Sequence, residues 1–489
     1  MKRAVAATAA FVLLWLVGLA GHPLLESTEG RYASIAAAMA RTGDFFDPRF
    51  NGILHLEKPP LAYWAAAVSL RVLPDGEFAV RLPATLAWLL AAWLVLRCAA
   101  AAGLDPRRAR WAAAFAALSP LAASEGHLLG CDVFLWIGVL LYQLGVLRWM
   151  VAAGPDALAA SLPARRTAAW LAGAGLGLGF MAKGHIVLVW TLLPTLVAFA
   201  VARQRAFLGP LGEARTWIAF ALLGLPWFVV EAVRHPGLLG YWLGHQTAAR
   251  YLTTVHGRGE PWWYFPALLP GIVLPWLPEC GRGLRRALRP AGASGASSAL
   301  GLEPASLFAL AAAFAPFVFL CFSGSKRVNY LLPMLGPLAW LAAAALPARR
   351  GRLARVWSAT WIVLLLAMPF VLPHVPRAVP PTRELVQSAR RAGASLVAFR
   401  VLPSSAPFYW GADMPAFQVP REGRFDAPAT VERWASPDAS ALRERLGAGG
   451  AVLCRARDAD AARAAAGAPL QQQASAGDLV LLSARIAAP

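Results

Sequence analysis

The chain has 489 residues, of which 58% are hydrophobic and 15% are charged, and its mean hydropathy is +0.52. Soluble domains usually carry about 25% charged residues, so these values exclude an ordinary soluble globular protein. We therefore interpret the chain as an integral membrane protein. The net charge of +20 does not indicate nucleic-acid binding, because the basic residues form short clusters between apolar runs rather than one patch.

Apolar runs long enough to form membrane-spanning helices recur as far as about residue 373. The runs predicted as spans are residues 4–21, 79–100, 110–125, 132–152, 167–182, 185–202, 216–233, 262–280, 303–322, 329–347 and 355–373. Marginal segments such as 61–73 raise the predicted count to about 11–13 transmembrane helices. The first run is interpreted as an uncleaved anchor, since no small-residue cleavage pattern follows it before His22 and Pro23.

The basic clusters predict the orientation of these spans. Short loops rich in Lys and Arg stay in the cytoplasm. Six such clusters alternate with the other loops: Lys2-Arg3, Arg107-Arg108-Arg110, Arg165-Arg166, Arg203-Arg205, Arg282-Arg285-Arg286-Arg289 and Arg349-Arg350-Arg352-Arg355. We therefore expect a multi-pass protein of the inner (plasma) membrane with a cytoplasmic N-terminus. The outer side receives residues 22–78, 126–131, 183–184, 234–261, 323–328 and everything after about residue 374.

The composition changes near residue 374, which predicts two domains, a transmembrane domain of residues 1–373 and a small α/β domain of residues 374–489 on the periplasmic face. The second part contains strand-like runs at 395–400, 451–454 and 479–483 and helical stretches at 382–392 and 439–446. Residues 290–301 are predicted as a flexible cytoplasmic linker. The glycine-rich run 173–179 is interpreted as close helix packing rather than a dinucleotide loop.

Acidic and basic side chains from distant segments fall in the loops predicted outside. A single charge at a span end usually lies at the level of the lipid headgroups. Many such groups on one face predict a polar cavity that opens outward, with cations for an anionic group and carboxylates for a leaving or attacking group. The groups include Glu26, Glu29, Arg31, Asp44, Asp47, Glu57, Lys58, Arg81, Asp132, Lys183, His245, Arg250, His256, Arg258, Glu260, Ser323, Ser325, Lys326 and Arg327.

Cations at headgroup depth suit a phosphate or pyrophosphate attached to a lipid, whose tail the apolar spans can hold. Lys58 is interpreted as a phosphate ligand, held by the turn that Pro59 and Pro60 impose. Glu57 would orient Lys58 or contact the polar part of the substrate. The structural alternative is a local surface ion pair between Glu57 and Lys58, worth about 0–1 kcal/mol.

Four motifs in and after the first outer loop carry a resemblance to a known family. They are Thr28-Glu29-Gly30-Arg31-Tyr32-Ala33, Gly43-Asp44-Phe45, Glu57-Lys58-Pro59-Pro60 and Ala79-Val80-Arg81-Leu82-Pro83. Together they closely resemble the first-loop motifs of bacterial members of the protein O-mannosyltransferase superfamily, nearest the aminoarabinose (lipid A) transferases. Shorter matches follow at Asp132, Ala182-Lys183-Gly184, His256–Tyr264, Ser325-Lys326, Tyr330–Pro333 and Pro407–Gly411.

The resemblance implies a mainly α, polytopic glycosyltransferase of the GT-C type that takes its sugar from a polyprenyl-phosphate donor. It implies 4-amino-4-deoxy-arabinose as a candidate sugar and lipid A or another glycolipid as the acceptor. The expected catalytic residues are Glu29, Asp132 and Glu57. The expected substrate- and phosphate-binding residues are Lys58, Arg81, Arg31, Tyr32, Lys183, His256, Lys326 and Tyr330. A divalent metal is compatible with the Glu and His residues, but no ligand spacing demands one, and the five cysteines show no paired spacing.

One departure from the family concerns the residue before Glu29, which is Thr28 where the family has Asp. Threonine cannot act as a base at neutral pH, so Glu29, Glu57 or Asp132 carries the acidic role, or no base is needed. A phosphate-monoester acceptor needs no base, because its second pKa is about 6. An enzyme acting on protein hydroxyls, a lipid-linked-sugar transporter and a membrane-anchored binding protein stay open as alternatives.

Overall fold

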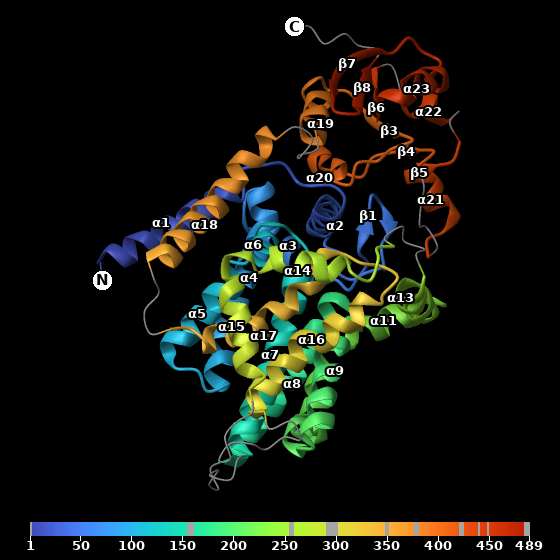
Figure 1. Cartoon of the computed structure of the whole chain (residues 1–489). Coiled ribbons are helices and arrows are strands. Elements are labelled where there is room, and N and C mark those ends of the chain that lie inside the picture. Colours follow the sequence, from blue (N-terminus) through green and yellow to red (C-terminus); the bar gives the residue numbers. More distant parts are fainter. Residues whose placement is uncertain are drawn as a thin grey trace. The chain divides into compact units, whose positions relative to one another are not determined.

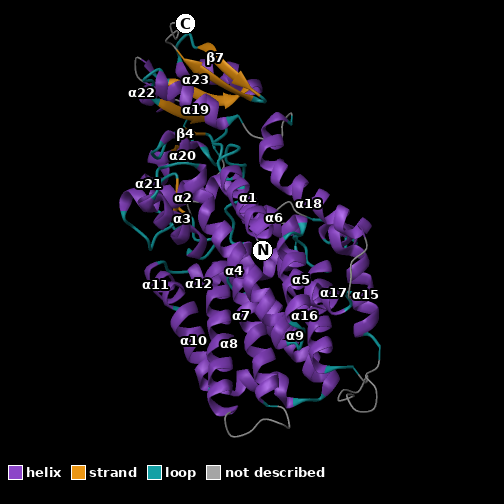
Figure 2. Cartoon of the chain, turned by 90° about the vertical axis from the view of Figure 1, so that its left-hand side faces the viewer, coloured by secondary structure: helices purple, strands orange, loops and turns teal. Residues whose placement is uncertain are grey.

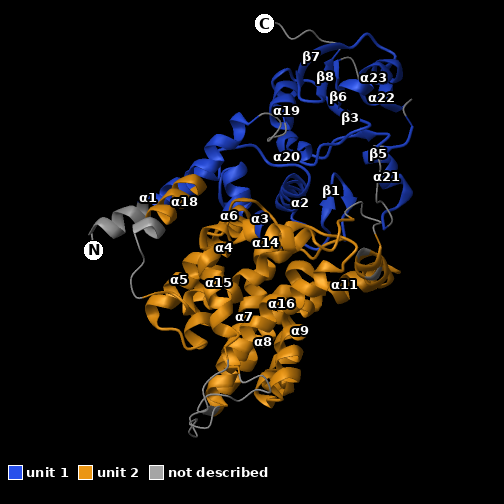
Figure 3. Cartoon of the chain, in the orientation of Figure 1, with its two compact units in different colours: residues 1–56, 62–83, 366–489 blue, residues 57–61, 84–365 orange. Residues whose placement is uncertain are grey.

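The computed structural model describes residues 2–153, 161–253, 259–289, 302–347, 352–375, 381–419, 425–438, 441–446 and 449–483. The chain forms two compact units, shown in Figure 3. Unit 1 comprises residues 1–56, 62–83 and 366–489, and unit 2 comprises residues 57–61 and 84–365. The boundary at residue 374 stays a prediction, and the linker predicted at 290–301 lies outside the described residues.

Unit 2 is built from helices, many of which are labelled in Figure 1; the symbol η marks a 3-10 helix, or a π-helix in the case of η2. They are α4 (Glu77–Ala101, which begins in unit 1), α5 (Pro106–Ala117), α6 (Pro120–His127), α7 (Asp132–Ala152), α8 (Ser161–Lys183), α9 (Ile186–Ala202), η1 (Arg205–Gly212), α10 (Ala214–Gly224), α11 (Pro226–Arg234), α12 (Leu238–Gly240), η2 (Tyr241–Ala249), α13 (Arg250–Leu252), α14 (Tyr264–Ile272), η3 (Leu274–Trp276), α15 (Leu277–Ala287), α16 (Pro304–Cys321), η4 (Val328–Met334), α17 (Leu335–Ala344) and α18 (Arg352–Val371, which ends in unit 1).

Glycines let α8 pack directly against α7 and α10. A Cβ on Gly175 would lie 2.4 Å from the backbone nitrogen of Tyr142 on α7, and one on Gly173 would lie 2.2 Å from the carbonyl oxygen of Thr216 on α10. Small residues allow this close backbone approach between membrane helices. The interpretation of residues 173–179 as a helix-packing run is therefore confirmed.

Four described helices are long and apolar enough to cross a membrane: α4, α7, α16 and residues 356–374 of α18 and η5 (Leu372–His374). The pair α10 and α11 makes a fifth candidate, bent by 50°. The expectation of continuous spans is wrong at 110–125, 216–233, 262–280 and 329–347, where the structure has consecutive shorter helices. Proline explains the breaks before Pro120, Pro226 and Pro275, because it lacks the amide hydrogen that continues a helix. The total of 11–13 spans stays a prediction.

Unit 1 combines helices with two sheets, whose strands are orange in Figure 2. Its remaining elements are α1 (Lys2–Gly18), α2 (Thr28–Thr42), β1 (Arg49–Phe50), β2 (Ile53–Leu54), α3 (Leu61–Val72, whose first residue is in unit 2), α19 (Thr382–Arg391), β3 (Leu396–Phe399), α20 (Ala406–Trp410), β4 (Ala416–Phe417), α21 (Pro428–Trp434), β5 (Ala435–Ser436), α22 (Ala441–Leu446), β6 (Ala451–Arg455), η7 (Ala456–Asp458), α23 (Ala459–Ala466), β7 (Gln471–Ala476) and β8 (Leu479–Ser483).

The larger sheet has the strand order β5-β4-β3-β6-β8-β7. Strands β5, β4, β3 and β6 run parallel, whereas β8 is antiparallel to both β6 and β7. Val452 pairs with Val397 on one side and Leu482 on the other, and all three are buried. The strands predicted at 395–400, 451–454 and 479–483 are confirmed as β3, β6 and β8, since their apolar runs form the centre of the sheet.

Within unit 1, the first loop is hydrogen-bonded to the C-terminal region. Ser34 Oγ donates to the Ser404 carbonyl oxygen at 2.8 Å, and the Ser405 amide donates to the Glu26 carboxylate at 3.1 Å. The Tyr409 hydroxyl accepts a 2.7 Å hydrogen bond from the Leu24 amide. These bonds fix α2 against α20. The C-terminal region therefore stabilises the first outer loop, which carries motifs that resemble those of the protein O-mannosyltransferase superfamily.

Helix α2 approaches the C-terminal region so closely at Gly30 that one added methyl group should lower the stability of the protein. A Cβ at Gly30 would lie 2.7 Å from the backbone nitrogen of Ser405, so Gly30→Ala should destabilise the protein by about 1–3 kcal/mol. The measurement is the thermal unfolding midpoint in detergent. Gly281→Ala is the matched control, because nothing lies within 4 Å of its added Cβ, and it should not lower the midpoint. A Gly30→Ala midpoint equal to that of the wild type would contradict the packing described.

Candidate active site

Unit 2 contains a cavity of about 800 Å³. Much of its wall is apolar and aromatic, and the wall includes Trp190 of α9, Phe228 of α11 and Trp242 of η2. The polar residues in the wall come from the ends of elements distant in sequence: Glu57, Lys58, Lys183, His185, Gln246, Thr247, Ser323, Ser325 and Tyr330. The cavity can therefore hold an apolar chain together with an anionic group.

Glu57 and Lys58 lie in the turn that precedes α3, and both side chains line this cavity. The Lys58 ammonium donates to the Glu57 carbonyl oxygen at 3.1 Å. An ammonium group has three donor hydrogens and binds phosphate as a compact point charge. Lys58 thus lies in the wall of the cavity, and its role in phosphate binding stays a prediction.

Lys183 and Asp132 meet because α8 ends where α7 begins. The Lys183 ammonium donates to Asp132 Oδ1, and the Asn329 amide donates to Asp132 Oδ2 at 2.7 Å. The Lys183 ammonium also lies 4.5 Å from the centroid of the Tyr330 ring. Asp132 is 3% exposed and is not among the residues that line the cavity, whereas Lys183 and Tyr330 are. Asp132 is thus placed to orient Lys183, and its catalytic role stays a prediction.

Lys326 is placed beside the cavity by the bend that follows α16. Its ammonium donates to the carbonyl oxygen of Ser323 and to that of Glu260, the latter at 2.8 Å. The side chains of Ser323 and Ser325 line the cavity. Burial lowers the pKa of Lys326 from its usual value. This lysine holds the loops around the cavity together, and direct phosphate binding by it remains a prediction.

Arg81 and Glu29 form a buried ion pair within unit 1. Arg81 is 0% exposed and binds the Glu29 carboxylate at two points, Nε to Oε1 at 2.7 Å and Nη2 to Oε2 at 2.9 Å. Its Nη1 donates to the carbonyl oxygens of Leu19 and His22 at 2.7 and 2.8 Å, and its Nη2 also donates to that of Pro23 at 3.1 Å. All five guanidinium hydrogens thus have acceptors, so phosphate binding by Arg81 would require this network to open.

Three further predicted residues have less defined surroundings. Tyr32 is buried on α2, and its ring packs edge-on against that of Tyr63 with centroids 4.8 Å apart. Arg31 is half-buried on the same helix. His256 lies outside the described residues. The roles predicted for these three side chains stay predictions.

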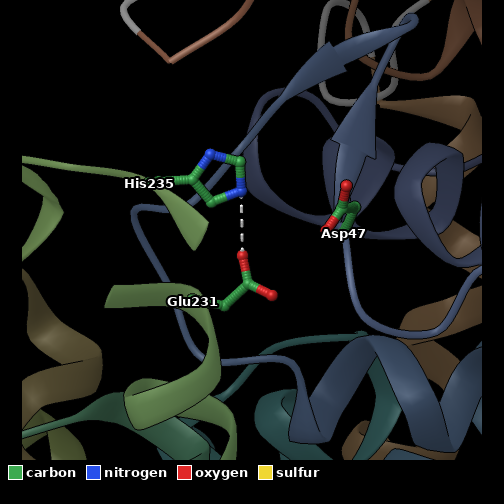
Figure 4. Close-up of side chains that lie close together, drawn as sticks. All are labelled: Asp47, Glu231 and His235. Carbon is green, nitrogen blue, oxygen red and sulfur yellow. Dashed lines mark ion pairs between the residues drawn. The ribbon is translucent and has the colours of Figure 1, made fainter. Parts of the chain in front are cut away.

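Glu231 and His235 are the candidate metal ligands within unit 2. The Glu231 carboxylate lies 3.3 Å from His235 Nε2, as Figure 4 shows, and 3.2 Å from Arg234. Arg234 already provides positive charge to this carboxylate, and neither Glu231 nor His235 is among the residues that line the cavity. We therefore assign no chemical step to a metal.

Asn329, which binds Asp132, and Thr247, which lines the cavity, are among the polar residues that the sequence motifs did not predict. Asn329 lies between Lys326 and Tyr330 in the sequence and completes the hydrogen bonding of Asp132. Thr247 Oγ1 lies 3.2 Å from His185 Nδ1, and both residues line the cavity. The sequence signal for Asn329 was an amide side chain in a short polar turn between apolar runs. No local feature of the sequence distinguishes Thr247.

Part of the sequence is similar to a known protein family. Residues 7–241 match the family described as dolichyl-phosphate-mannose-protein mannosyltransferase. The predicted relationship to the superfamily is therefore confirmed, and it covers the first loop together with Lys58, Arg81, Asp132 and Lys183.

Two proteins that are similar to this chain are named as aminoarabinose transferases. The undecaprenyl phosphate-alpha-4-amino-4-deoxy-L-arabinose arabinosyl transferase of Pseudomonas paraeruginosa is 31% identical over 345 residues, which cover 70% of this chain and 59% of the relative. The arabinosyl transferase 2 of Pseudomonas fluorescens is 29% identical over 422 residues, which cover 82% and 68%. The chain thus spans about three fifths of the length of the first relative.

A solved structure shares the fold over the whole length of the chain. ArnT from Cupriavidus metallidurans bound to undecaprenyl phosphate superposes with a TM-score of 0.81, covering 100% of this chain and 99% of ArnT at 22% sequence identity. The predicted fold class, a mainly helical membrane protein of the GT-C type with a small C-terminal α/β region, is confirmed.

The Arg81–Glu29 pair predicts how stability depends on pH. Burial by itself would raise the pKa of Glu29, but the Arg81 charge and its hydrogen bonds lower that pKa below its usual value. A lowered folded-state pKa contributes stability that is complete above the unfolded pKa of about 4.3 and is lost as the pH falls toward the folded value. The thermal unfolding midpoint should therefore decrease as the pH falls below about 4.3.

Glu29→Gln should weaken this dependence of stability on acid pH. It should also lower the free energy of unfolding at neutral pH by about 3–5 kcal/mol, because the Arg81 charge stays buried without its partner. Glu432→Gln, an exposed acid on α21, is the control and should follow the wild-type pH profile. If Glu29→Gln unfolds at the wild-type temperature at pH 7, the pair is not the structural element described.

Proposed function

We propose that the chain is a membrane glycosyltransferase that moves a sugar from a polyprenyl-phosphate donor to an acceptor outside the cytoplasm. The observation that carries this proposal is the cavity of unit 2, in which apolar and aromatic walls meet the ammonium groups of Lys58 and Lys183. Such a cavity suits a lipid with one phosphate. The named activity of the similar Pseudomonas proteins and the undecaprenyl phosphate bound to ArnT support the same substrate class.

The distribution of lysine supports this assignment. Only four of the 46 basic residues are lysines: Lys2, Lys58, Lys183 and Lys326. Two of them line the cavity, and Lys326 donates to the backbone beside it. A chain that uses arginine almost everywhere else keeps lysine here, where a compact charge with three donors fits a tetrahedral phosphate between other groups.

In the proposed reaction the bond between the anomeric carbon and the phosphate oxygen breaks as the acceptor oxygen bonds to that carbon. The lipid phosphate leaves with the electron pair and gains negative charge, which Lys58 and Lys183 stabilise in the transition state. Asp132, itself held by Asn329, keeps Lys183 in place. The Lys183 ammonium therefore does not have to move as the phosphate gains charge. The proton of a hydroxyl acceptor would pass to a carboxylate of the site, and Glu57 is the acid that lines the cavity.

The acceptor that best fits the sequence is a phosphate, as on lipid A. Thr28 replaces the carboxylate of the family motif, and a phosphate monoester is already largely ionised near pH 7, with a second pKa of about 6. The sugar that the named relatives transfer, 4-amino-4-deoxy-L-arabinose, is the first candidate for the donor. Both assignments belong to the proposal.

Lys58 provides the direct test of the activity. Lys58→Gln should lower the rate of lipid-phosphate release from a polyprenyl-phosphate sugar by about 100-fold or more, because one cation is lost from the transition state. The assay uses the full chain in proteoliposomes, and Lys58→Arg should recover part of the rate. Lys2→Gln, the control variant, removes the same charge near the N-terminus. It should keep the wild-type rate of lipid-phosphate release. Donor that moves across the bilayer unchanged, without phosphate release, would indicate a transporter instead.

Lipid A mass spectra test the acceptor. Cells that express the gene should show lipid A heavier by one sugar residue, and cells without the gene should lack this species. Sugar recovered on protein with unchanged lipid A would contradict the phosphate acceptor but leave the glycosyltransferase activity in place.

A further inference from the structure

A second concentration of charge lies in unit 2 at the C-terminal end of α17. Helices α5 and α15 both pack against α17, as Figure 1 shows. We define the basic surface as seven arginines on and beside these two helices: Arg107, Arg108, Arg110, Arg282, Arg285, Arg286 and Arg289. The proposed function makes no use of this surface.

Three of these arginines converge on carbonyl groups at and just beyond the end of α17. Arg286 Nη1 donates to the Ala344 carbonyl oxygen at 3.0 Å, and Arg107 Nη2 donates to that of Pro347 at 3.1 Å. Arg108 Nη2 lies 3.5 Å from the Leu346 carbonyl oxygen. The negative end of the helix dipole attracts these guanidinium groups and holds them close together in spite of their like charge.

Helix α15 presents the other arginines on its exposed side. On its buried side, a Cβ added at Gly283 would lie 2.4 Å from the Leu341 carbonyl oxygen, so this face is closed against α17. Arg282, Arg285 and Arg286 are exposed, and so is Arg289 beyond the helix end.

Carboxylates neutralise only part of this charge. Asp105 lies 3.6 Å from Arg108, and Glu279 lies 3.4 Å from Arg282. Across the described parts of the chain, no salt bridge involves the other five arginines of the surface. Leu277 and Leu288, which are 41% and 62% exposed, lie at the start of α15 and just beyond its end. Unneutralised guanidinium groups beside exposed leucines match a ligand that carries an anion next to an acyl chain.

We propose that the basic surface binds the headgroups of anionic phospholipids. Guanidinium groups bind phosphodiesters at two points, and the neighbouring leucines contact the start of the acyl chains. This site is separate from the donor cavity. Helix α17 follows η4, which carries the cavity residue Tyr330, and the basic surface lies at the opposite end of α17. Lipids bound there stabilise the ends of α5, α15 and α17 where like charges meet.

The test measures lipid retention by the full chain with native mass spectrometry. The protein in a zwitterionic detergent receives equal amounts of phosphatidylglycerol and phosphatidylcholine with the same acyl chains. The wild type should retain phosphatidylglycerol preferentially. In the double variant Arg285→Gln/Arg289→Gln, the preference for phosphatidylglycerol over phosphatidylcholine should fall about 25-fold. Each arginine near a charged lipid surface contributes about fivefold to the affinity for that lipid. Both side chains are exposed, so the unfolding midpoint in detergent should stay at the wild-type value.

A control variant, Arg391→Gln/Arg445→Gln, removes two exposed arginines from the C-terminal region of unit 1 and should keep the wild-type preference. Equal losses in both variants would mean that net charge alone attracts the lipid, and this outcome would overturn the proposal. Equal retention of the two lipids by the wild type would overturn it as well.

Discussion

The contact between α7 and α8 is the constraint on which the candidate site depends. Glycines 138, 145 and 175 lack the side chains that would separate the two backbones, so the helices run side by side along their length. Their packing brings the start of one helix to the end of the other, where Asp132 meets Lys183. A buried lysine in a membrane protein requires an anionic partner, and this partner also fixes where the ammonium lies. The cavity thus obtains a rigid cation from helix packing rather than from a loop.

The two basic residue types have different places in this molecule. Lysine is rare, and three of its four occurrences lie in or beside the cavity of unit 2. Arginine fills structural positions, such as the buried pair of Arg81 with Glu29 and the ends of α17. A planar guanidinium with five donors can satisfy several fixed carbonyl groups at once, whereas a compact ammonium suits a ligand that arrives and leaves. This division is consistent with a site that holds phosphate transiently inside a scaffold tied together by arginine.

Unit 1 shows that a functional motif can also serve the fold. Glu29 and Arg81 belong to two of the four motifs found in and after the first outer loop. They form a buried ion pair with each other in unit 1. The same region is hydrogen-bonded to the C-terminal part of the chain through Glu26, Ser34 and Tyr409. Motif identity alone therefore does not separate residues that touch a substrate from residues that hold the loop in shape.

The sequence by itself determined the membrane character, the helical class, the central strands of the C-terminal sheet and the segments that carry the polar groups of the site. These properties follow from local composition and periodicity, which each segment carries independently of the others. Tertiary structure decided where Pro120 and Pro226 end helices within apolar runs, that Asp132 stands behind Lys183, and that the Arg81 donors are already occupied. Such facts depend on which distant atoms come within hydrogen-bonding distance, and no local pattern records that distance.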